Sequence, residues 1–530
     1  MSTASQTADA GREPARAAAS PPTFRPLTGL QLWVTAVALA LGTFMQVLDS
    51  TIANVSIPTI SGNLGVSSSQ GIWVITAFAV ANGVTVPLTG WLMGRYGAIQ
   101  TFIASVALFT LASLLCGIAW NIESLIGFRI FQGAVSGPMI PGSQALLLMI
   151  FPARQRGTAM AIWSMTTLVA PVCGPILGGY ISDNFAWEWI FLINVPVGIV
   201  CVFLCWRGLA GRETATRKLP IDTVGFAMLL IWVGALQIML DTGKDAGWFG
   251  SPVIVTEACV AAVGFVAWLI WELTEKHPIV DLSLFRSRNF ALGSIVFSLA
   301  YAVFFGNNLL LPLWLQTQMG YIATFAGLVA APSGIVALTL TPFAARFLGQ
   351  VDSRIVATAS LAAFGLSFWM RSDLTAQAAF GNFVTPMLVQ GIGMSVFFVS
   401  MVSLCLKDVS PAQTPSATGL VNFARITAGS FAASLVTTLQ ENGVALHQTR
   451  LVESVPGDGS VLTEAISSLQ KTGVSAQQAV GAIAHEFSSQ AYLLATLDVF
   501  RQSAWICFLM IPLIWLTKRA FSGGAGAVAD

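Results

Sequence analysis

Fourteen separate apolar stretches, each long enough to cross a bilayer, constrain the fold of this 530-residue chain more than any other feature. A membrane-spanning helix needs about 20 apolar residues. The stretches cover residues 30–57, 71–92, 99–119, 124–150, 158–182, 188–206, 221–241, 252–272, 290–312, 324–347, 355–371, 381–406, 414–438 and 500–518. Because lipid offers the backbone no hydrogen-bond partners, each stretch is expected to be helical. The sequence therefore predicts an all-α polytopic membrane protein. A charged fraction of only 9% excludes a soluble fold of this size.

The distribution of Lys and Arg predicts how the chain is threaded through the membrane. If the N-terminus is inside, eighteen of the 25 basic residues fall in cytoplasmic segments. Basic residues concentrate in the cytoplasmic loops of membrane proteins. Both termini are therefore expected in the cytoplasm, and the external segments hold only Lys244, Arg371, Arg450, Lys471 and Arg501.

Short sequence matches repeat at an offset of about 255 residues along the chain. The pair Gln-Gly at 132–133 recurs at 390–391, and Pro-Ala at 152–153 recurs at 411–412. Duplicated halves that share a site near the membrane midplane are typical of transporters. We therefore expect the following organisation: a disordered cytoplasmic tail at 1–26, a six-helix half at 27–207, two inserted helices at 208–289, a second six-helix half at 290–519 that includes an external loop at 439–499, and a cytoplasmic tail at 520–530.

One carboxylate lies inside the first apolar stretch. The segment FMQVLDSTIANVSIP, residues 44–58, contains Asp49 and no other charged residue. A carboxylate at that depth costs roughly 2.5–3.5 kcal/mol to insert. The cost falls if the side chain takes up a proton, faces a polar cavity or meets a cation. Asp49 is therefore a candidate proton-coupling residue, although a structural contact to a neighbouring helix fits the same pattern.

An arginine, Arg129, lies early in the fourth stretch, within LIGFRIFQGAVSGPMIPG. Arginine keeps its charge in proteins and needs a carboxylate, carbonyl groups or water as partners. Asp49 is its natural counter-charge within the first half of the chain. Such a pair lets a proton on Asp49 loosen a contact between helices, or it holds the helices together, and the sequence leaves both roles open.

Small residues mark two stretches for close helix packing. Gly133 and Gly137 are four residues apart in the fourth stretch, a spacing that lets two helix backbones approach each other. The fifth stretch carries a denser run with a similar consequence, since Pro and Gly are tolerated in membrane helices that neighbours support. The residues of this run are Gly174, Pro175, Gly178 and Gly179.

Other polar residues give weaker signals. Arg425 and Glu257 lie within apolar stretches and either pair locally or take part in transport. The three His offer no metal-ligand cluster, and no GxxxxGK[ST] motif is present, so we expect no metal, no cofactor and no ATP-driven step. Energy must then come from an ion gradient. The net charge of +1 gives no indication of a nucleic-acid partner.

The predicted external loop at 439–499 is much longer than an ordinary connection. It is acidic, and its segments LTEAISSLQ and SAQQAVGAIAHEF have the apolar spacing of helices. Both a surface that docks a partner and a mobile acidic loop are compatible with this composition.

Several stretches resemble fourteen-span drug:proton antiporters of the major facilitator superfamily, most closely the EmrB type of Gram-negative bacteria. They are LDSTIANVSIPTISGNLG, GWLMGRYG, RIFQGAVSGPMIP, WSMTTLVAPVCGPILGGYISD, WEWIFLINVP and HPIVDLSLFRSRNF. The resemblance implies the major facilitator fold with 6 + 2 + 6 helices in a bacterial inner membrane. It implies proton coupling at Asp49 and Arg129 and an antiporter signature at Gly174, Pro175, Gly178 and Gly179. It also implies export of hydrophobic toxins together with a periplasmic membrane-fusion adaptor and an outer-membrane channel.

The chain departs from the family pattern at two places. The loop after the second stretch has Gly94 where the family has an acidic residue, and Ala98 and Ile99 where it has basic ones. Near the sixth stretch Glu188 stands where the family often has Arg or Gly. The first departure weakens any charge relay centred on this loop, and Glu188 has no assigned role.

The sequence thus indicates a membrane transporter, not an enzyme, that exchanges external protons for hydrophobic or amphipathic compounds. A substrate cavity is expected between the two halves. A proton-coupled symporter of an organic solute and a non-transporting membrane scaffold or sensor remain as alternatives. The candidate cavity residues are Phe44, Gln46, Asn54, Gln132 and Arg425.

Overall fold

The structure is a computed structural model that describes residues 26–520, except 67, 217–219, 245, 277, 322, 349–350, 454–459 and 472. The side chains of some helical residues, Asn54, Pro175 and Gly179 among them, also lie outside this description. The predicted tails at 1–26 and 520–530 fall almost entirely outside the described residues, so their predicted disorder is not addressed by the structure.

The described part of the chain is helical throughout and contains no strand, which confirms the predicted all-α fold. The elements of the first half are α1 (Gly29–Leu64), α2 (Ser68–Thr85), η1 (Val86–Leu88), α3 (Thr89–Tyr96), α4 (Ala98–Gly117), α5 (Ile122–Ser136), α6 (Met139–Ile150), η2 (Ala153–Gln155), α7 (Arg156–Asn184), α8 (Trp189–Leu192) and α9 (Asn194–Leu209). Three of the predicted spans are therefore broken helices, formed by α2 with α3, by α5 with α6 and by α8 with α9.

Two helices and a second half follow. The inserted pair is α10 (Thr223–Thr242) and α11 (Pro252–Thr274), with η3 (Trp248–Gly250) between them. The second half consists of η4 (Leu282–Arg286), α12 (Arg288–Thr317), α13 (Ala323–Leu348), α14 (Ser353–Arg371), α15 (Phe380–Leu406), α16 (Thr414–Glu453), α17 (Ser460–Gln470) and α18 (Ala476–Trp515). Within the described residues, 13 spans are long and apolar enough to cross a membrane, and α7 is the remaining long helix of the bundle.

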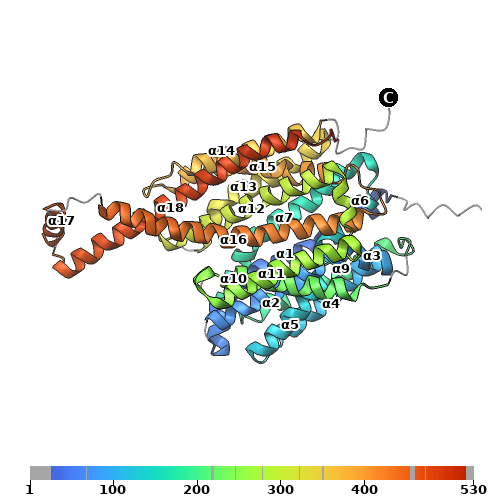
Figure 1. Ribbon diagram of the computed structural model, residues 1–530, viewed down its shortest axis with the longest axis horizontal. Coiled ribbons are helices and arrows are strands. Elements are labelled where there is room, and N and C mark those ends of the chain that lie inside the picture. The colour runs from blue at the N-terminus through green and yellow to red at the C-terminus, as the bar shows by residue number, and fades with distance from the viewer. Residues whose placement is uncertain are drawn as a thin grey trace, which may run out of the picture.

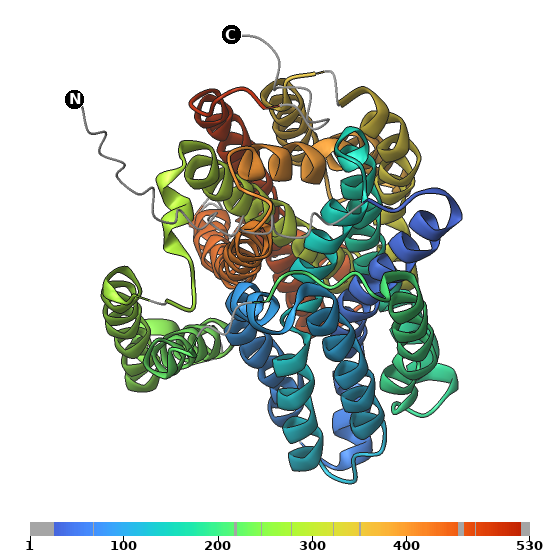
Figure 2. The same ribbon diagram turned by 90° about the vertical axis from the view of Figure 1, so that its right-hand side faces the viewer.

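The two halves lie side by side and contact each other through a few helices (Figures 1 and 2). Helix α7 of the first half packs against α13 and α15 of the second, while α16 of the second half packs against α3 and α6 of the first. The inserted pair stands at the outside of the bundle in Figure 2, where α10 contacts both α2 and α16. One apolar cluster of described residues joins the two halves and the pair α10 and α11, with members such as Phe102, Phe297 and Trp268.

Local side chains explain where several helices begin. Asn121 accepts a hydrogen bond from the Ser124 amide at 2.8 Å and caps α5, and Asp222 accepts one from the Gly225 amide at 2.9 Å and caps α10. Asp352 caps α14 by accepting from the Arg354 amide at 3.1 Å. Such caps satisfy amide groups that have no partner inside the helix, which a helix entering or leaving lipid requires.

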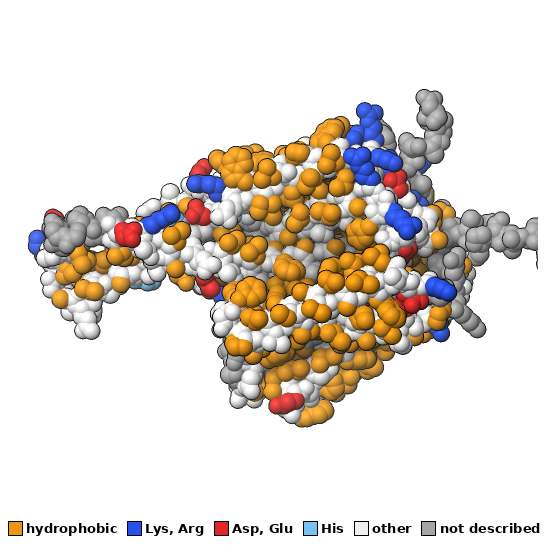
Figure 3. Space-filling view, in the orientation of Figure 1, with side chains coloured by type: hydrophobic (Ala, Val, Ile, Leu, Met, Phe, Trp, Pro, Cys, Tyr) orange, Lys and Arg blue, Asp and Glu red, His pale blue; other side chains and the backbone are white. Residues whose placement is uncertain are grey.

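Lys and Arg side chains gather at one end of the bundle, as the right-hand side of Figure 3 shows. We call this the basic end. The residues there come from the ends of helices in both halves, and they include Arg95, Arg207, Arg354, Lys407 and Lys518. The sides of the bundle are covered with apolar side chains in the same view, as expected for a surface in contact with lipid.

The segment 439–499, which the sequence places in a long external loop, is instead mostly helical. Helix α16 continues to Glu453 and α18 starts at Ala476, so both helices extend well beyond the bundle, with α17 at their tip (Figure 1). Polar contacts hold the two helices together where they leave the bundle, because Gln440 donates to Thr496 at 2.8 Å and His447 lies 2.8 Å from Asp498. We call α17 and the extended parts of α16 and α18 the protrusion.

Candidate functional site

The core of the first half contains a buried ion pair between α1 and α5. Arg129 Nη1 lies 2.6 Å from Asp49 Oδ2, and the two side chains are 0% and 1% exposed. The two residues are eighty positions apart in the chain, so the fold brings together the charges that the sequence suggested as partners. A buried pair is destabilising to break because the remaining charge then lacks a partner.

Neutral polar side chains complete the coordination of Asp49. Its Oδ1 accepts hydrogen bonds from Asn194 Nδ2 at 2.8 Å and from Gln132 Nε2 at 3.2 Å. Ser113 Oγ accepts from the same two amide groups, at 3.3 Å from Asn194 and 2.7 Å from Gln132. The carboxylate therefore joins α1, α5 and α9 directly, and Ser113 connects α4 to the same network through Gln132 and Asn194.

The guanidinium of Arg129 has partners besides the carboxylate. Its Nε donates to the Val74 carbonyl at 3.0 Å and Nη1 donates to Gln132 Oε1 at 2.6 Å. The guanidinium carbon also lies 4.3 Å from the ring centre of Phe78, a favourable position for a cation over an aromatic face. Arg129 Nη2 has no hydrogen-bond partner among the described atoms. The arginine can therefore stay in place when Asp49 is neutral.

Two glycines of α7 lie directly against α1, close to Asp49. A side chain at Gly174 would overlap Thr51, and a Cβ at Gly178 would lie 3.2 Å from the Ile52 carbonyl oxygen. The predicted close packing of this helix against a partner is confirmed at these two positions, while the side-chain surroundings of Pro175 and Gly179 lie outside the described residues. Helix α7 thus lies between α1, which carries Asp49, and helices α13 and α15 of the second half.

Helix α5 packs in the same way against α2. A Cβ at Gly133 would overlap the Phe78 carbonyl, and one at Gly137 would overlap Thr85. The spacing of Gly133 and Gly137 therefore has the predicted role of letting two helices meet closely. Since Arg129 lies one turn before Gly133 on α5, the same contact fixes the helix that carries the arginine.

Arg425 does not join this site but lies at the seam between the halves. Its guanidinium carbon is 4.4 Å from the ring centre of Tyr301, 5.7 Å from that of Phe398 and 5.8 Å from that of Trp163. Its Nη2 donates to Asn422 Oδ1 at 3.0 Å. Because Trp163 belongs to the first half and the other residues to the second, Arg425 occupies an aromatic site shared by both halves.

The residues expected to line one cavity fall in different places. Gln132 is buried in the ion-pair network and contacts Asp49 instead. Gln46 is 3% exposed, with Oε1 lacking a hydrogen-bond partner among the described atoms. Phe44 is partly buried and packs against the apolar cluster around Leu48 and Ile52. The side chain of Asn54 is outside the described residues.

Sequence reasoning missed several buried polar residues. Asn194 and Ser113 carry no charge, so no charge-balance argument pointed to them, although Asn194 stands alone in the apolar segment FLINVP. Arg371 was assigned to the external side, but its side chain is 0% exposed at the end of α14. Glu272 at the end of α11 is likewise buried, and it accepts a hydrogen bond from the Val280 amide at 3.3 Å.

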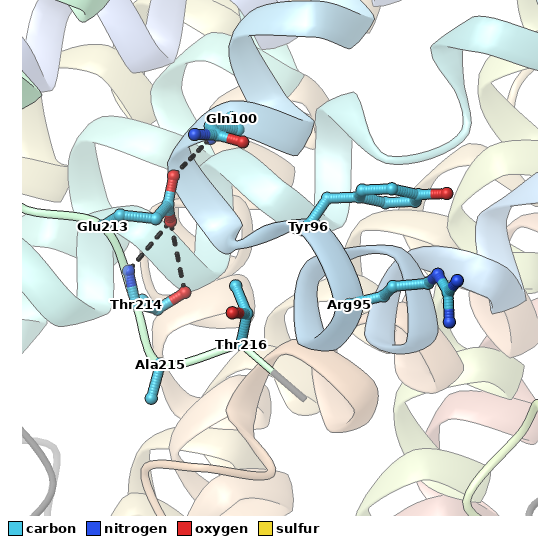
Figure 4. Close-up of a pocket in the computed structure, with 7 residues that line it drawn as sticks. All are labelled: Arg95, Tyr96, Gln100, Glu213, Thr214, Ala215 and Thr216. Atoms are coloured by element: carbon cyan, nitrogen blue, oxygen red, sulfur yellow. Dashed lines mark hydrogen bonds between the residues drawn. The ribbon is translucent and has the colours of Figure 1, made fainter. Parts of the chain in front are cut away.

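The basic end holds a cavity of about 520 Å³ beside the N-terminus of α4 (Figure 4). Glu213 accepts hydrogen bonds there from the Ile99 amide at 3.0 Å and the Gln100 amide at 2.8 Å, and Thr214 accepts one from the Ala98 amide at 2.9 Å. Glu213 and Thr214, in the linker that follows α9, therefore cap α4. Gly97, the residue before α4, cannot do this because it has no side chain. An acidic residue at a helix N-terminus is stabilising, so this loop has a carboxylate anchor of its own.

The seam between the halves is closed at the basic end. Asn422 Nδ2 donates to Gln144 Oε1 at 2.6 Å across the seam. Gly419 of α16 faces Thr89 at the start of α3, where a Cβ would lie 3.3 Å from the threonine Cβ. Contacts of this kind between rigid halves can open and close as the halves rock against each other.

Two helical halves with a closed seam at one end and an ion pair buried in one half define a membrane transporter. Residues 39–433 match the Major Facilitator Superfamily, and the chain belongs to that family. It is 46% identical over 503 residues to the multidrug export protein EmrB of Escherichia coli K12, covering 95% of this chain and 98% of the relative. It is 45% identical to the fatty acid resistance protein FarB of Neisseria gonorrhoeae, covering 95% and 99%.

The fold is also shared with a transporter of known structure. The human organic anion transporter MFSD10 superimposes with a TM-score of 0.57 at 12% sequence identity, covering 92% of this chain and 100% of that chain. At this identity the similarity concerns the fold alone. The resemblance seen in the sequence to EmrB-type transporters of the major facilitator superfamily is confirmed.

Proposed function

We propose that this chain is a proton-driven efflux transporter that exports hydrophobic and amphipathic compounds in exchange for protons. The observation that carries the proposal is the ion pair of Asp49 and Arg129, which is buried between α1 and α5 and hydrogen-bonded to Asn194 of α9. A proton on Asp49 removes the attraction to Arg129 and turns two strong acceptor oxygens into weaker ones. Asn194 and Gln132 are then free to shift.

The contacts of α1 connect the protonation site at Asp49 with the interface between the two halves. Thr51 and Ile52 follow Asp49 closely on α1 and lie against Gly174 and Gly178 of α7. Helix α7 in turn packs on α13 across the seam. Coupling requires that the proton and the substrate favour opposite states of the transporter. We place the substrate at the site of Arg425 and Trp163, at the same seam, where its binding would favour the state opposite to the one that the proton favours.

Substrate class and orientation follow from the relatives and from the charges. The relatives are named for multidrug export and for fatty acid resistance, and the seam around Arg425 is aromatic, which suits hydrophobic compounds. We place the basic end and both termini on the cytoplasmic side of a bacterial inner membrane, since Lys and Arg favour that side. The structure then corresponds to a state closed toward the cytoplasm.

Drug-induced proton release from everted vesicles tests the exchange. In vesicles energised so that the lumen is acidic, adding a hydrophobic substrate is expected to release luminal protons and to accumulate the substrate inside. The release is followed with a pH-sensitive dye and the uptake with labelled substrate. A proton-coupled symporter would instead move both in one direction, and a membrane scaffold or sensor would move neither. Either result would overturn the proposal.

We further propose that the protrusion docks a periplasmic membrane-fusion adaptor that leads to an outer-membrane channel. It extends from the end of the bundle opposite the basic end (Figure 1), on the side we assign to the periplasm. Leu462, on one face of α17, is exposed, and Ile466, which follows it at helical spacing, is partly exposed. Exposed apolar side chains at helical spacing are typical of a surface that receives a partner helix.

A replacement of residues 452–474 by a short Gly-Ser linker tests this docking role. Resistance of cells to the substrate is expected to fall to that of cells without the transporter, because the compound is no longer passed to the outer membrane. Proton exchange in everted vesicles is expected to stay unchanged, since the ion pair is remote from the protrusion. The point variant Leu462→Glu should behave like the replacement, and Glu464→Gln on the opposite face of α17 should behave like wild type. Unchanged resistance in the replacement variant would contradict the proposal.

A further inference from the structure

The inserted helices α10 and α11 form a structural unit attached to both halves. Helix α10 packs along α2 of the first half. On its other side, α10 contacts α16 of the second half. Ser434 of α16 donates to the Leu240 carbonyl at 2.6 Å, and Trp248 donates to Thr438 of α16 at 2.9 Å. The pair therefore covers the seam between α2 and α16 from the lipid side.

A groove of about 420 Å³ lies between α10, α11 and α2. Its size is that of a site for a small organic molecule. The lining is almost entirely apolar, and most of its side chains belong to helices that face lipid. They include Val80, Leu230, Ile231, Gly234, Val260 and one acidic residue, Glu257.

Glu257 stands out because no other charged residue lines the groove. It lies in the second turn of α11, inside a predicted membrane span, and is partly buried. Its Oε2 atom is buried and has no hydrogen-bond partner among the described atoms. A carboxylate inside a membrane span is costly, and such residues commonly mark a functional pathway. Among the described residues, nothing occupies this oxygen, so it is available to a positive group or a hydrogen-bond donor from outside the chain.

We propose that this groove is a membrane-facing capture site for hydrophobic organic cations, with Glu257 as their counter-charge. The apolar wall binds the hydrophobic body of the molecule, and the carboxylate selects a positive group at the edge of the bilayer core. A compound dissolved in lipid can enter the groove directly, next to the seam that α10 covers. Only its onward transport rests on the proposed function, whereas binding in the groove does not need the ion pair of Asp49.

Photo-crosslinking tests the capture site in the full-length protein. The purified chain is placed in phosphatidylglycerol nanodiscs with a triphenylphosphonium cation that carries a diazirine, and labelled residues are mapped by mass spectrometry. We expect the cation to label α10 and α11, and Glu257→Gln to reduce this labelling about tenfold, because the variant loses the attraction between the carboxylate and the positive charge at a partly exposed site. An uncharged triphenylmethyl analogue should label both proteins equally.

Three control variants separate the possible explanations. Ala235→Trp, which fills the groove without changing its charge, is expected to reduce labelling by both probes. Glu123→Gln, which removes an exposed carboxylate from α5, should label like wild type. Asp49→Asn should also keep its labelling, so failure of proton coupling and failure of the capture site give different results.

Two outcomes would overturn the proposal. One is unchanged labelling by the cation in Glu257→Gln, which would show that the carboxylate does not select the charge. The other is labelling that disappears when phosphatidylethanolamine is added to the discs. That result would assign the groove to a lipid with an amine headgroup and not to a transported cation.

Discussion

Asp49→Asn is expected to abolish proton-driven export while leaving exchange of substrate for substrate intact. Asparagine has the shape of a protonated aspartic acid but cannot release a proton, so it fixes the site in its neutral form. The amide does not titrate, so no proton can be exchanged at this position. We therefore expect drug-induced proton release in everted vesicles to fall by about 100-fold or more. Uptake of labelled substrate against unlabelled substrate, without a pH gradient, measures the exchange that remains.

The matched control is Asp373→Asn, which removes an exposed carboxylate from the second half and should transport like wild type. Asp49→Glu keeps a titratable group but lengthens the side chain, so partial activity is expected. In Asp49→Asn, Arg129 keeps the Val74 carbonyl, Gln132 and the ring of Phe78 as partners, and the substrate exchange that remains shows that the variant is folded. Proton-driven export at the wild-type rate in Asp49→Asn would show that the proton travels by another residue.

The ion pair could be predicted from the sequence because charge inside lipid is rare and must be balanced. Once the apolar stretches were located, Asp49 and Arg129 were the opposite charges in the first half that needed each other. The same reasoning could not find Asn194, since a neutral amide carries no charge to balance. Its role depends on the break between α8 and α9, where the first residue of α9 reaches the carboxylate.

Tertiary packing explains the other differences. Hydropathy placed Arg371 at an outer edge, but side chains such as Phe368, Met387 and Phe500 enclose it. Hydropathy also placed the end of one span at residue 438 and the start of the last span at residue 500. It did so because hydropathy reports contact with lipid and not the continuity of a helix. Helices α16 and α18 continue beyond these limits by packing on each other, through Val444, Ala491 and their neighbours.

Close packing of α7 against α1 lies next to the ion pair. Gly174 and Gly178 were identified in the sequence as a packing surface, yet the sequence could not say which helix they meet. The structure shows that they meet α1 at Thr51 and Ile52, directly after Asp49. Asp49 and a contact that tolerates no added side chain therefore lie within about one turn of the same helix. If Asp49 takes up a proton as we propose, α1 is the element through which this proton acts on the second half.

The ion pair also gives a stability prediction that separates structure from transport. Removing Arg129 leaves Asp49 without its counter-charge in a buried site, with only Asn194 and Gln132 to donate to it. Removing Asp49 leaves Arg129 with a carbonyl, an amide oxygen and an aromatic ring. The two single changes are therefore unequal, and the change at Arg129 is the more destabilising one. Removing both charges leaves no unpaired ion in the core.

Arg129→Gln is expected to lower the free energy of unfolding by about 3–5 kcal/mol, the typical cost of leaving a buried charge unpaired. Asp49→Asn combined with Arg129→Gln should regain most of this loss, while proton-driven export stays absent. Unfolding of the purified variants in one detergent, followed by denaturant titration, measures the cycle. Arg501→Gln, which removes an exposed arginine from α18, is the control. If the losses of the two single variants simply add, the residues are not coupled, and the pair of Asp49 and Arg129 cannot be the element that senses the proton.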